Sequence, residues 1–189
     1  MSSKYQLQPQ YPGNRIYLRQ WQPQDAAALL EYRLENRSFL QPFEPAQPSD
    51  HFTSQFAEQK IEQWIDESVS DIGYAFGIFL IESDLLVGTL HLNRVIRGPL
   101  FNCLVGYSMA QRFNGQGLMT EAVGISLSIA FGSLALHRVE AGVMPRNIGS
   151  KRTLEKNGFR QEGLFRKYLR INGEWEDHAV FAILADEWV

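Results

Sequence analysis

The chain has 189 residues, 44% of them hydrophobic, and these values fit one globular domain with a sizeable core rather than a disordered chain. Its net charge of −3 excludes a global positive field that would hold nucleic acid non-specifically, so we predict no direct nucleic-acid binding. Cys103 is the only cysteine, which excludes an intramolecular disulfide and a cysteine-rich zinc site.

The N-terminal segment has no signal-peptide pattern, and no uncharged stretch approaches the roughly 18 residues of a membrane helix. We therefore expect a cytoplasmic protein that does not contact a membrane. Residues 1–13 are rich in Gln and Pro and predict a loose N-terminal arm, which leaves 14–189 as a single domain. Residues 16–19 predict a short strand. The apolar spacing of residues 26–34 predicts a helix that ends before the prolines of the segment 35–45.

The middle of the chain is predicted to hold a second helix and a hairpin. Apolar residues between 56 and 65 mark the helix, with Ser49 or Asp50 as its N-cap. Residues 74–81 and 85–92 are aromatic and β-branched runs around a short polar turn, which is typical of a hairpin.

The C-terminal half is predicted to alternate strands and helices. In chain order we expect a strand at 102–109, a helix at 118–131, a strand at 138–143, a helix at 147–157, and paired strands at 159–169 and 178–184. A central sheet with helices on both faces follows from this order, within one mixed α/β domain.

A glycine-rich loop precedes the helix predicted at 118–131. The first amides of a helix have no intrahelical partner and attract an anion, and Gly115 and Gly117 let backbone amides approach it closely. Arg112 adds a charge that can bridge two phosphate oxygens. We therefore predict a diphosphate site. An ordinary tight turn and a dinucleotide-binding loop are the alternatives, although Thr120 stands where the latter has its third glycine.

A second polar cluster opens the helix at 147–157. Asn147 is predicted to be the N-cap, Ser150 lies in the first turn, and Gly158 ends the helix. A helix cap explains Asn147 by itself. An amide and a hydroxyl at this place can also reach a ligand that lies against the sheet.

Together these residues resemble the GNAT superfamily of N-acetyltransferases, whose core order is strand, Arg112-x-x-Gly115-x-Gly117, helix, strand, Asn147-x-x-Ser150, helix, Gly158. The chain is most similar to the RimJ/RimL branch, the ribosomal-protein N-terminal acetyltransferases, and to its RimJ type in particular. The strings that carry this likeness lie at 35–45, 95–98, 104–108, 115–119 and 172–178. The resemblance covers roughly residue 15 to the C-terminus. It implies a GNAT fold, with a mostly antiparallel sheet splayed between strands 102–109 and 138–143.

The resemblance also implies acetyl-CoA as cosubstrate, with its pantetheine arm in the splay and its pyrophosphate on the loop amides, and no metal. The cofactor-binding residues it implies are Val105, Tyr107, Ser108, Met109, Arg112, Asn114, Gly115, Gln116, Gly117, Leu118, Met119, Thr120, Asn147 and Ser150. The implied acceptor is a protein N-terminus, with a ribosomal protein as partner and a monomer or homodimer as the assembly. We place Glu35, Arg37, Glu44 and His178 at the acceptor site.

The catalytic groups depart from the wider family. Many members carry a tyrosine as thiolate acid where this chain has Leu154, so Ser150 inherits that role by resemblance. Leu104 and Leu169 replace the glutamate bases of other members, which leaves the base unassigned. A water relay with no single base is the favoured route, and Glu44 is the first side-chain candidate, as base or as ammonium anchor.

Other routes stay open at this stage. Asp177, His178, His91 or a water relay could accept the proton, and Cys103 could act as a nucleophile instead of a core residue. An α-amino group has a pKa of about 7.7–8.0 and lysine about 10.4, so an enzyme without an obvious base is better matched to a peptide N-terminus. A small-molecule amine as acceptor and a non-catalytic acetyl-CoA-binding module are the alternatives.

Overall fold

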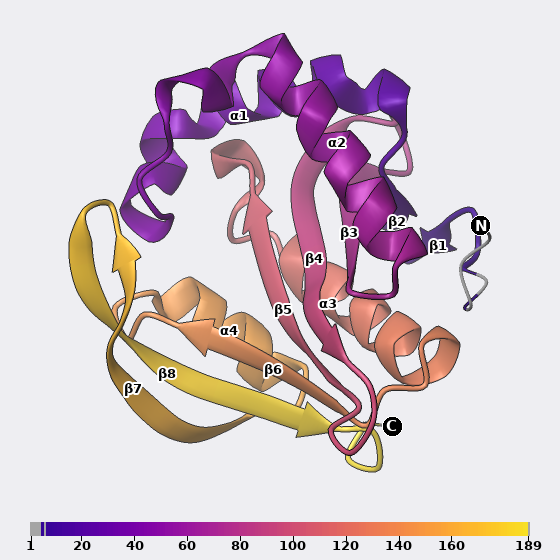
Figure 1. Cartoon of the computed structure of the whole chain (residues 1–189), viewed down its shortest axis with the longest axis vertical. Coiled ribbons are helices and arrows are strands. Elements are labelled where there is room, and N and C mark those ends of the chain that lie inside the picture. The colour runs from indigo at the N-terminus through magenta and orange to yellow at the C-terminus, as the bar shows by residue number, and fades with distance from the viewer. Residues whose placement is uncertain (1–4, 6, 189) are drawn as a thin grey trace.

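The computed structural model describes residue 5 and residues 7–188, which build one eight-stranded sheet with helices on both faces (Figure 1). The strand order is β1-β2-β3-β4-β5-β6-β8-β7, and each neighbouring pair is antiparallel except β5 with β6. The strands are β1 (Tyr11–Pro12), β2 (Ile16–Gln20), β3 (Gly73–Leu80), β4 (Leu86–Ile96), β5 (Asn102–Met109), β6 (Arg138–Val143), β7 (Arg160–Ile171) and β8 (Glu174–Leu184). The predicted mixed α/β fold is confirmed.

Two hydrophobic clusters fix the helices to opposite faces of the sheet. Neighbouring residues of a strand point to opposite faces, so in β3 Phe76 packs in the cluster of α3 and α4, whereas Ala75 packs in that of α1 and α2. The helices are α1 (Ala26–Leu40), α2 (Ser54–Val69), α3 (Leu118–Ser128) and α4 (Ile148–Lys156). No helix in the described part of the chain combines the length and apolar character that crossing a membrane requires.

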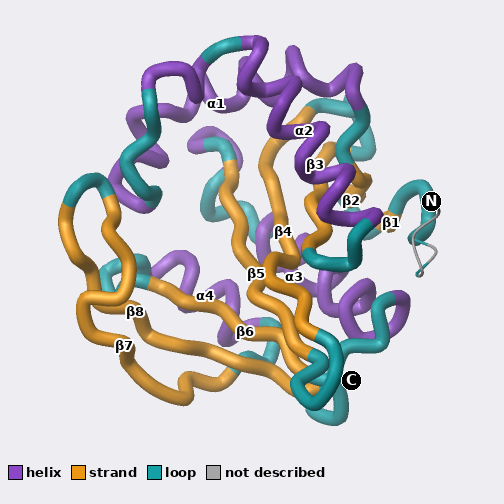
Figure 2. Tube along the Cα trace, in the orientation of Figure 1, coloured by secondary structure: helices purple, strands orange, loops and turns teal. Residues whose placement is uncertain are grey.

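The sheet divides between β5 and β6. Among the described residues these strands pair only from Asn102 to Leu104 with Arg138 to Glu140. From Val105 and Ala141 onward they separate, and in Figure 1 β5 and β6 run apart from a shared end. The tube view shows the same divergence, with α4 behind it (Figure 2). One edge of β5 therefore faces a gap where a central strand normally has a neighbour.

Three local expectations need correction. Residues 11–12 of the expected loose arm form β1, because Tyr11 buries its ring edge-on to Phe76. Residues 1–4 and 6 of that arm lie outside the described residues. The N-cap of α2 is Thr53 rather than Ser49 or Asp50, because Thr53 is extended and its side chain accepts the Phe56 N–H.

The first helix is also longer than predicted. It continues to Leu40, two residues before Pro42, and thus includes most of the segment that was expected to be a loop. Glu35 and Arg37 are therefore helical residues. The predicted end of α4 is confirmed, since Gly158 follows the helix with a φ of +84°. Asn172 and Gly173 form the β7–β8 turn, with positive φ at both residues.

Candidate active site

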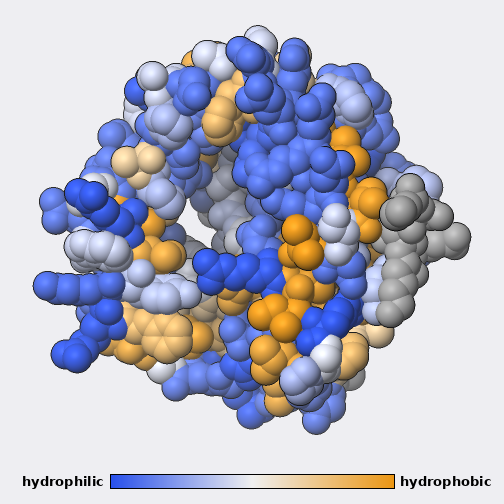
Figure 3. All heavy atoms as spheres, viewed as in Figure 1, coloured by the Kyte–Doolittle hydropathy of each residue, from blue (hydrophilic) through white to orange (hydrophobic). Residues whose placement is uncertain are grey.

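The split between β5 and β6 opens into a cavity of about 630 Å³. Its walls are the free half of β5, the end of β6, the N-terminal turns of α3 and α4, and the segment that follows α1. In the space-filling view an opening lies between the α1 end of the molecule and the β7–β8 hairpin (Figure 3). A cavity of this size is typical of small-ligand sites.

The glycine-rich loop forms one wall. Gly115 and Gly117 have φ values of +74° and +80°, a conformation that side-chain-bearing residues rarely adopt. Gly117 is the N-cap of α3 and has no side chain with which to cap the helix, so the first amides of α3 are available to a ligand. The Arg15 guanidinium donates to the Gln116 carbonyl over 2.9 Å and thereby ties the loop to β2.

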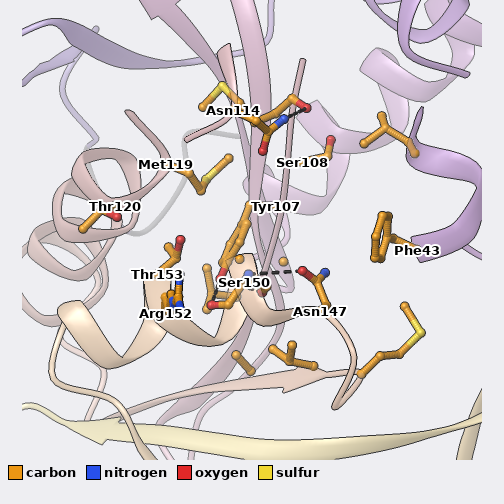
Figure 4. Close-up of a pocket in the computed structure, with 18 of the residues that line it drawn as sticks. Phe43, Tyr107, Ser108, Asn114, Met119, Thr120, Asn147, Ser150, Arg152 and Thr153 are labelled. Atoms are coloured by element: carbon orange, nitrogen blue, oxygen red, sulfur yellow. Dashed lines mark hydrogen bonds between the residues drawn. The ribbon is translucent and has the colours of Figure 1, made fainter. Parts of the chain in front are cut away.

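The first turn of α4 lies opposite this loop. The Asn147 side chain accepts the Ser150 N–H at 3.1 Å, which confirms the predicted N-cap. The Ser150 hydroxyl lies 3.0 Å from the Tyr107 hydroxyl of β5, and Figure 4 shows the two side chains pointing toward one another. Leu154, one turn further on, is fully buried in the core.

The cavity carries opposite charges at its two ends. Arg152 and Lys156 lie four residues apart on α4 and both line it. Phe43 and Arg152 stand on opposite sides of the pocket (Figure 4), and Glu44 follows Phe43 in the chain. Among the described lining residues, Glu44 is the only one with a carboxylate. One end thus suits phosphates and the other suits an amine.

The surroundings of Glu44 are apolar and crowded. Phe39, Leu40 and Phe43 line the same end of the cavity. Burial raises the pKa of Glu44 above its usual value, and the charge of the nearby Arg33 guanidinium opposes that rise. A raised pKa makes the carboxylate a stronger base than an exposed one.

The C-terminal hairpin holds the Glu44 segment in place. Asn172 at the hairpin turn donates its N–H to the Glu44 carbonyl at 3.0 Å. Arg146 donates to the Pro42 carbonyl at 2.9 Å and forms an ion pair with Glu176 on β8 at 2.8 Å. The tip of the hairpin beside the end of α1 is visible in Figure 2. The two halves of the sheet are thus joined above the cavity.

Most residues expected at the site lie there. All residues expected to bind the cofactor line the cavity except Arg112, which lies over the Phe113 ring, and Gln116, which donates to the Arg112 carbonyl. Of the residues expected at the acceptor site, Glu44 and His178 line the cavity. Glu35 and Arg37 are exposed residues of α1 that do not line it in the described structure; Arg37 stacks on Phe52.

The remaining base and nucleophile candidates lie elsewhere. His91 packs against the Trp64 ring, and burial lowers its pKa to about 4. Asp177 accepts the Lys167 N–H. Cys103 is fully buried in the core, and burial raises the pKa of its thiol to about 12, which disfavours a thiolate nucleophile. The described residues also contain no cluster of metal-ligating side chains.

Sequence reasoning missed several lining residues. The spacing of Arg152 and Lys156 places them on one face of a helix, but only the structure shows that this face meets the cavity. Phe39 and Phe43 were read as part of a loop motif, whereas they form the apolar wall beside Glu44. The Tyr107–Ser150 contact joins residues 43 positions apart, and no local pattern predicts it.

Comparison with known proteins gives the same picture. The family model "Acetyltransferase (GNAT) domain" matches residues 15–160. "Probable N-acetyltransferase YjcK" of Bacillus subtilis is 45% identical over 91% of this chain and 95% of that protein. The "[Ribosomal protein uS5]-alanine N-acetyltransferase" of Escherichia coli is 31% identical over 93% of this chain and 90% of its own length.

Solved structures agree with these relatives. The ribosomal-protein-S5-alanine acetyltransferase of Vibrio fischeri superposes with a TM-score of 0.90 at 30% identity, covering 95% of this chain and 98% of that one. Mycobacterium smegmatis RimJ, solved in complex with CoA-disulfide, gives 0.87 at 33% identity, with 91% and 83% covered.

Proposed function

This chain belongs to the GNAT acetyltransferase family and is an acyltransferase, and we propose that it moves the acetyl group of acetyl-CoA onto the N-terminal α-amine of a protein, with a ribosomal protein as acceptor. The observation that carries the proposal is one cavity in which the split β5 edge, the glycine-rich loop, Ser150 and Glu44 meet. The acceptor class is supported by relatives whose names state ribosomal-protein substrates.

The chain's residues fit CoA along the whole cavity. Gly115 leaves a cradle, since a Cβ there would meet no described atom within 4 Å, and the loop amides can surround a diphosphate. Arg152 and Lys156 add positive charge for phosphate. The β5 edge beyond Leu104 offers backbone groups to the amides of a pantetheine arm. When bound, the cosubstrate supplies an activated acetyl thioester.

The acceptor amine enters from the Glu44 end. An α-amine is partly protonated near neutral pH, so it needs a carboxylate to hold the ammonium form or to accept its proton. The half-buried Glu44 lies in the cavity and has a raised pKa, which suits either role. The walls formed by Phe39 and Phe43 are suited to a short N-terminal residue rather than to a charged side chain.

Ser150 is the residue that we expect to donate a hydrogen bond to the departing sulfur. Its backbone is fixed by the Asn147 cap, and its hydroxyl faces the cavity from the first turn of α4. A donor to a developing negative charge speeds thioester cleavage, and general acid help of this kind is commonly worth about a hundredfold or more.

The test is acetylation by the purified protein, measured by mass spectrometry. Peptides that begin with Ala or Ser should gain one acetyl group at the α-amine, whereas the same peptides with a blocked N-terminus and an internal lysine should not. Turnover of a polyamine or aminoglycoside without peptide turnover would move the assignment to small amines. Absence of CoA binding by calorimetry would refute the acetyltransferase assignment itself.

A further inference from the structure

Tyr107 brings a phenol into the cavity from the strand side. It lies on β5 past the last residue pair that joins β5 to β6, and its hydroxyl is 3.0 Å from Ser150 Oγ and 3.3 Å from the Ser150 carbonyl oxygen. Among the described residues that line the cavity, Tyr107 is the only tyrosine. Leu154 occupies the α4 position from which the wider family was expected to present a phenol, and it is fully buried.

The hydroxyl groups of Tyr107 and Ser150 carry one hydrogen each. The Tyr107 hydroxyl can donate to the Ser150 carbonyl, in which case Ser150 Oγ donates to Tyr107, or it can donate to Ser150 Oγ itself. The distance to Oγ is the shorter. When Tyr107 donates to Oγ, the hydroxyl hydrogen of Ser150 is not needed for this contact and is left to point into the cavity. The direction of the Tyr107 hydrogen bond thus sets where the Ser150 hydrogen points.

The geometry points to Tyr107 as a positioning residue for the reaction, whose phenol donates to Ser150 Oγ so that Ser150 donates to the sulfur of the departing CoA thiolate. This inference rests on the proposed function, because it assumes that a thioester binds in the split between β5 and β6. It assigns to one strand side chain a role that neither the sequence pattern nor the comparisons gave it.

The acid–base chemistry of the pair is consistent with hydrogen bonding rather than complete proton transfer. Burial raises the pKa of Tyr107 to about 12, and the hydrogen bond to Ser150 opposes that rise. The phenol is therefore protonated throughout the pH range in which an α-amine reacts. A thiol has a pKa of about 8.5, so a thiolate cannot take the phenol proton outright and is stabilised by hydrogen bonds instead.

The reaction balances as follows. The amine nitrogen bonds to the acetyl carbon, the carbon–sulfur bond breaks, and the electron pair leaves on sulfur. The proton lost by nitrogen goes to Glu44 or to water. The thiolate, held by the Ser150 hydroxyl, takes a proton from solvent on its release. Tyr107 and Ser150 end the cycle in their starting protonation states.

A direct test measures the thiol pKa of bound CoA, which requires no acceptor. Thiolate formation is followed by ultraviolet absorbance as a function of pH for the wild type and for Tyr107→Phe, which keeps the ring and removes the hydroxyl. We expect the thiol pKa to rise by about one unit in Tyr107→Phe, since hydrogen bonds to a charged group are among the stronger ones. Tyr17→Phe is the matched control, because the Tyr17 hydroxyl donates to Asp84 outside the cavity. CoA bound to this variant should have the same thiol pKa as CoA bound to the wild type.

Kinetics give a second readout. We expect kcat, followed by the production of free CoA, to fall about tenfold in Tyr107→Phe. The KM for acetyl-CoA should change less than about threefold. Because Tyr107 acts through Ser150, the double variant Tyr107→Phe/Ser150→Ala should be no slower than Ser150→Ala alone. Additive losses would mean that the two hydroxyls act separately and would overturn the inference.

The outcomes separate this inference from the function on which it rests. CoA binding with an unchanged thiol pKa in Tyr107→Phe overturns the role of Tyr107 and leaves the acetyltransferase intact. Absence of CoA binding to the wild type overturns both. If Tyr107→Phe fails to fold, Ser150→Ala carries the test: it keeps the phenol in place, and an unchanged thiol pKa in that variant overturns the relay, because Tyr107 acts only through Ser150 Oγ.

Discussion

Glu44 combines an apolar setting with a position on the acceptor side of the cavity. Its carboxyl is half-buried beside aromatic residues, and the charge that opposes its raised pKa belongs to Arg33. The Arg33 side chain is itself buried against the Phe56 and Trp64 rings, which keeps its charge out of bulk solvent. The carboxyl is thus kept in an environment that penalises its charge and makes it a better proton acceptor.

We predict that Glu44→Gln lowers kcat/KM for an N-terminal peptide about a hundredfold, because the amide can neither hold an ammonium ion nor accept its proton. The affinity for CoA should be unchanged, since Glu44 follows Phe43, which stands across the pocket from Arg152 (Figure 4). Steady-state kinetics and calorimetry measure the two quantities. Glu31→Gln, an exposed carboxylate of the same helix region, serves as the control and should act like the wild type. Equal activity of Glu44→Gln and wild type would exclude Glu44 from catalysis.

Glu44→Gln should lower activity but increase stability relative to the wild type as pH rises from acid to neutral. A carboxyl whose pKa is raised in the folded state binds its proton more tightly there than in the unfolded state, so the free energy of unfolding falls as pH rises above 4.5. Glu44→Gln removes this loss, so its stability relative to the wild type should increase from acid to neutral pH. Urea unfolding at several pH values measures the difference. A constant difference would show that Glu44 has an ordinary pKa.

At the scale of elements, the glycine-rich loop depends on backbone conformation rather than on side chains. Gly115 has a positive φ and open space around the position of a Cβ, so an added methyl group meets strain in the backbone and no clash among the described atoms. Left-handed backbone costs an ordinary residue about 1–2 kcal/mol. Relief of that strain would turn the loop amides away from the diphosphate.

We therefore predict that Gly115→Ala weakens CoA binding by about tenfold and lowers the free energy of unfolding by about 1 kcal/mol. Gly132→Ala is a matched control, because Gly132 also has open space, but its φ is not in the left-handed region. That variant should bind CoA normally and be as stable as the wild type or slightly more so. Calorimetry and urea unfolding measure both effects. Normal CoA binding by Gly115→Ala would mean that the loop amides do not hold the diphosphate.

The elements themselves were largely predictable, because their signals are local. Aromatic and β-branched runs predicted the β3–β4 hairpin, apolar spacing predicted α2 and α3, and Asn147 and Gly158 marked the ends of α4. The extension of α1 through Glu35 and Arg37 was missed, because a motif that ends in prolines was read as a loop. The side chains that complete the site meet through tertiary packing. Arg146 reaches Pro42, and no pattern within either segment records that contact.

At the scale of the whole molecule, the split sheet divides the chain into two parts that share one hydrophobic cluster but few strand pairs. The strands β1 to β5 carry α1 and α2, and β6 to β8 carry α4, while β5 and β6 share three residue pairs among the described residues. Above the cavity, Arg146 and Asn172 contact the segment after α1, and inside it the Tyr107 hydroxyl of β5 meets Ser150 of α4. A ligand that lies between β5 and β6 would supply contacts to both parts at once.

CoA should therefore stabilise the whole protein and protect one region most. At a CoA concentration of about 100 times Kd the gain is about 2.7 kcal/mol, which for a chain of this size raises Tm by roughly 5–10 °C. Amide hydrogen exchange should slow most in residues 105–109 and 141–143, where the two strands lack each other as partners. The amides of β3 lie between two paired strands and serve as an internal control, with little change beyond the global gain. Uniform slowing, with no excess in residues 105–109 and 141–143, would show that CoA does not fill the gap between β5 and β6 and would place the thioester away from Ser150.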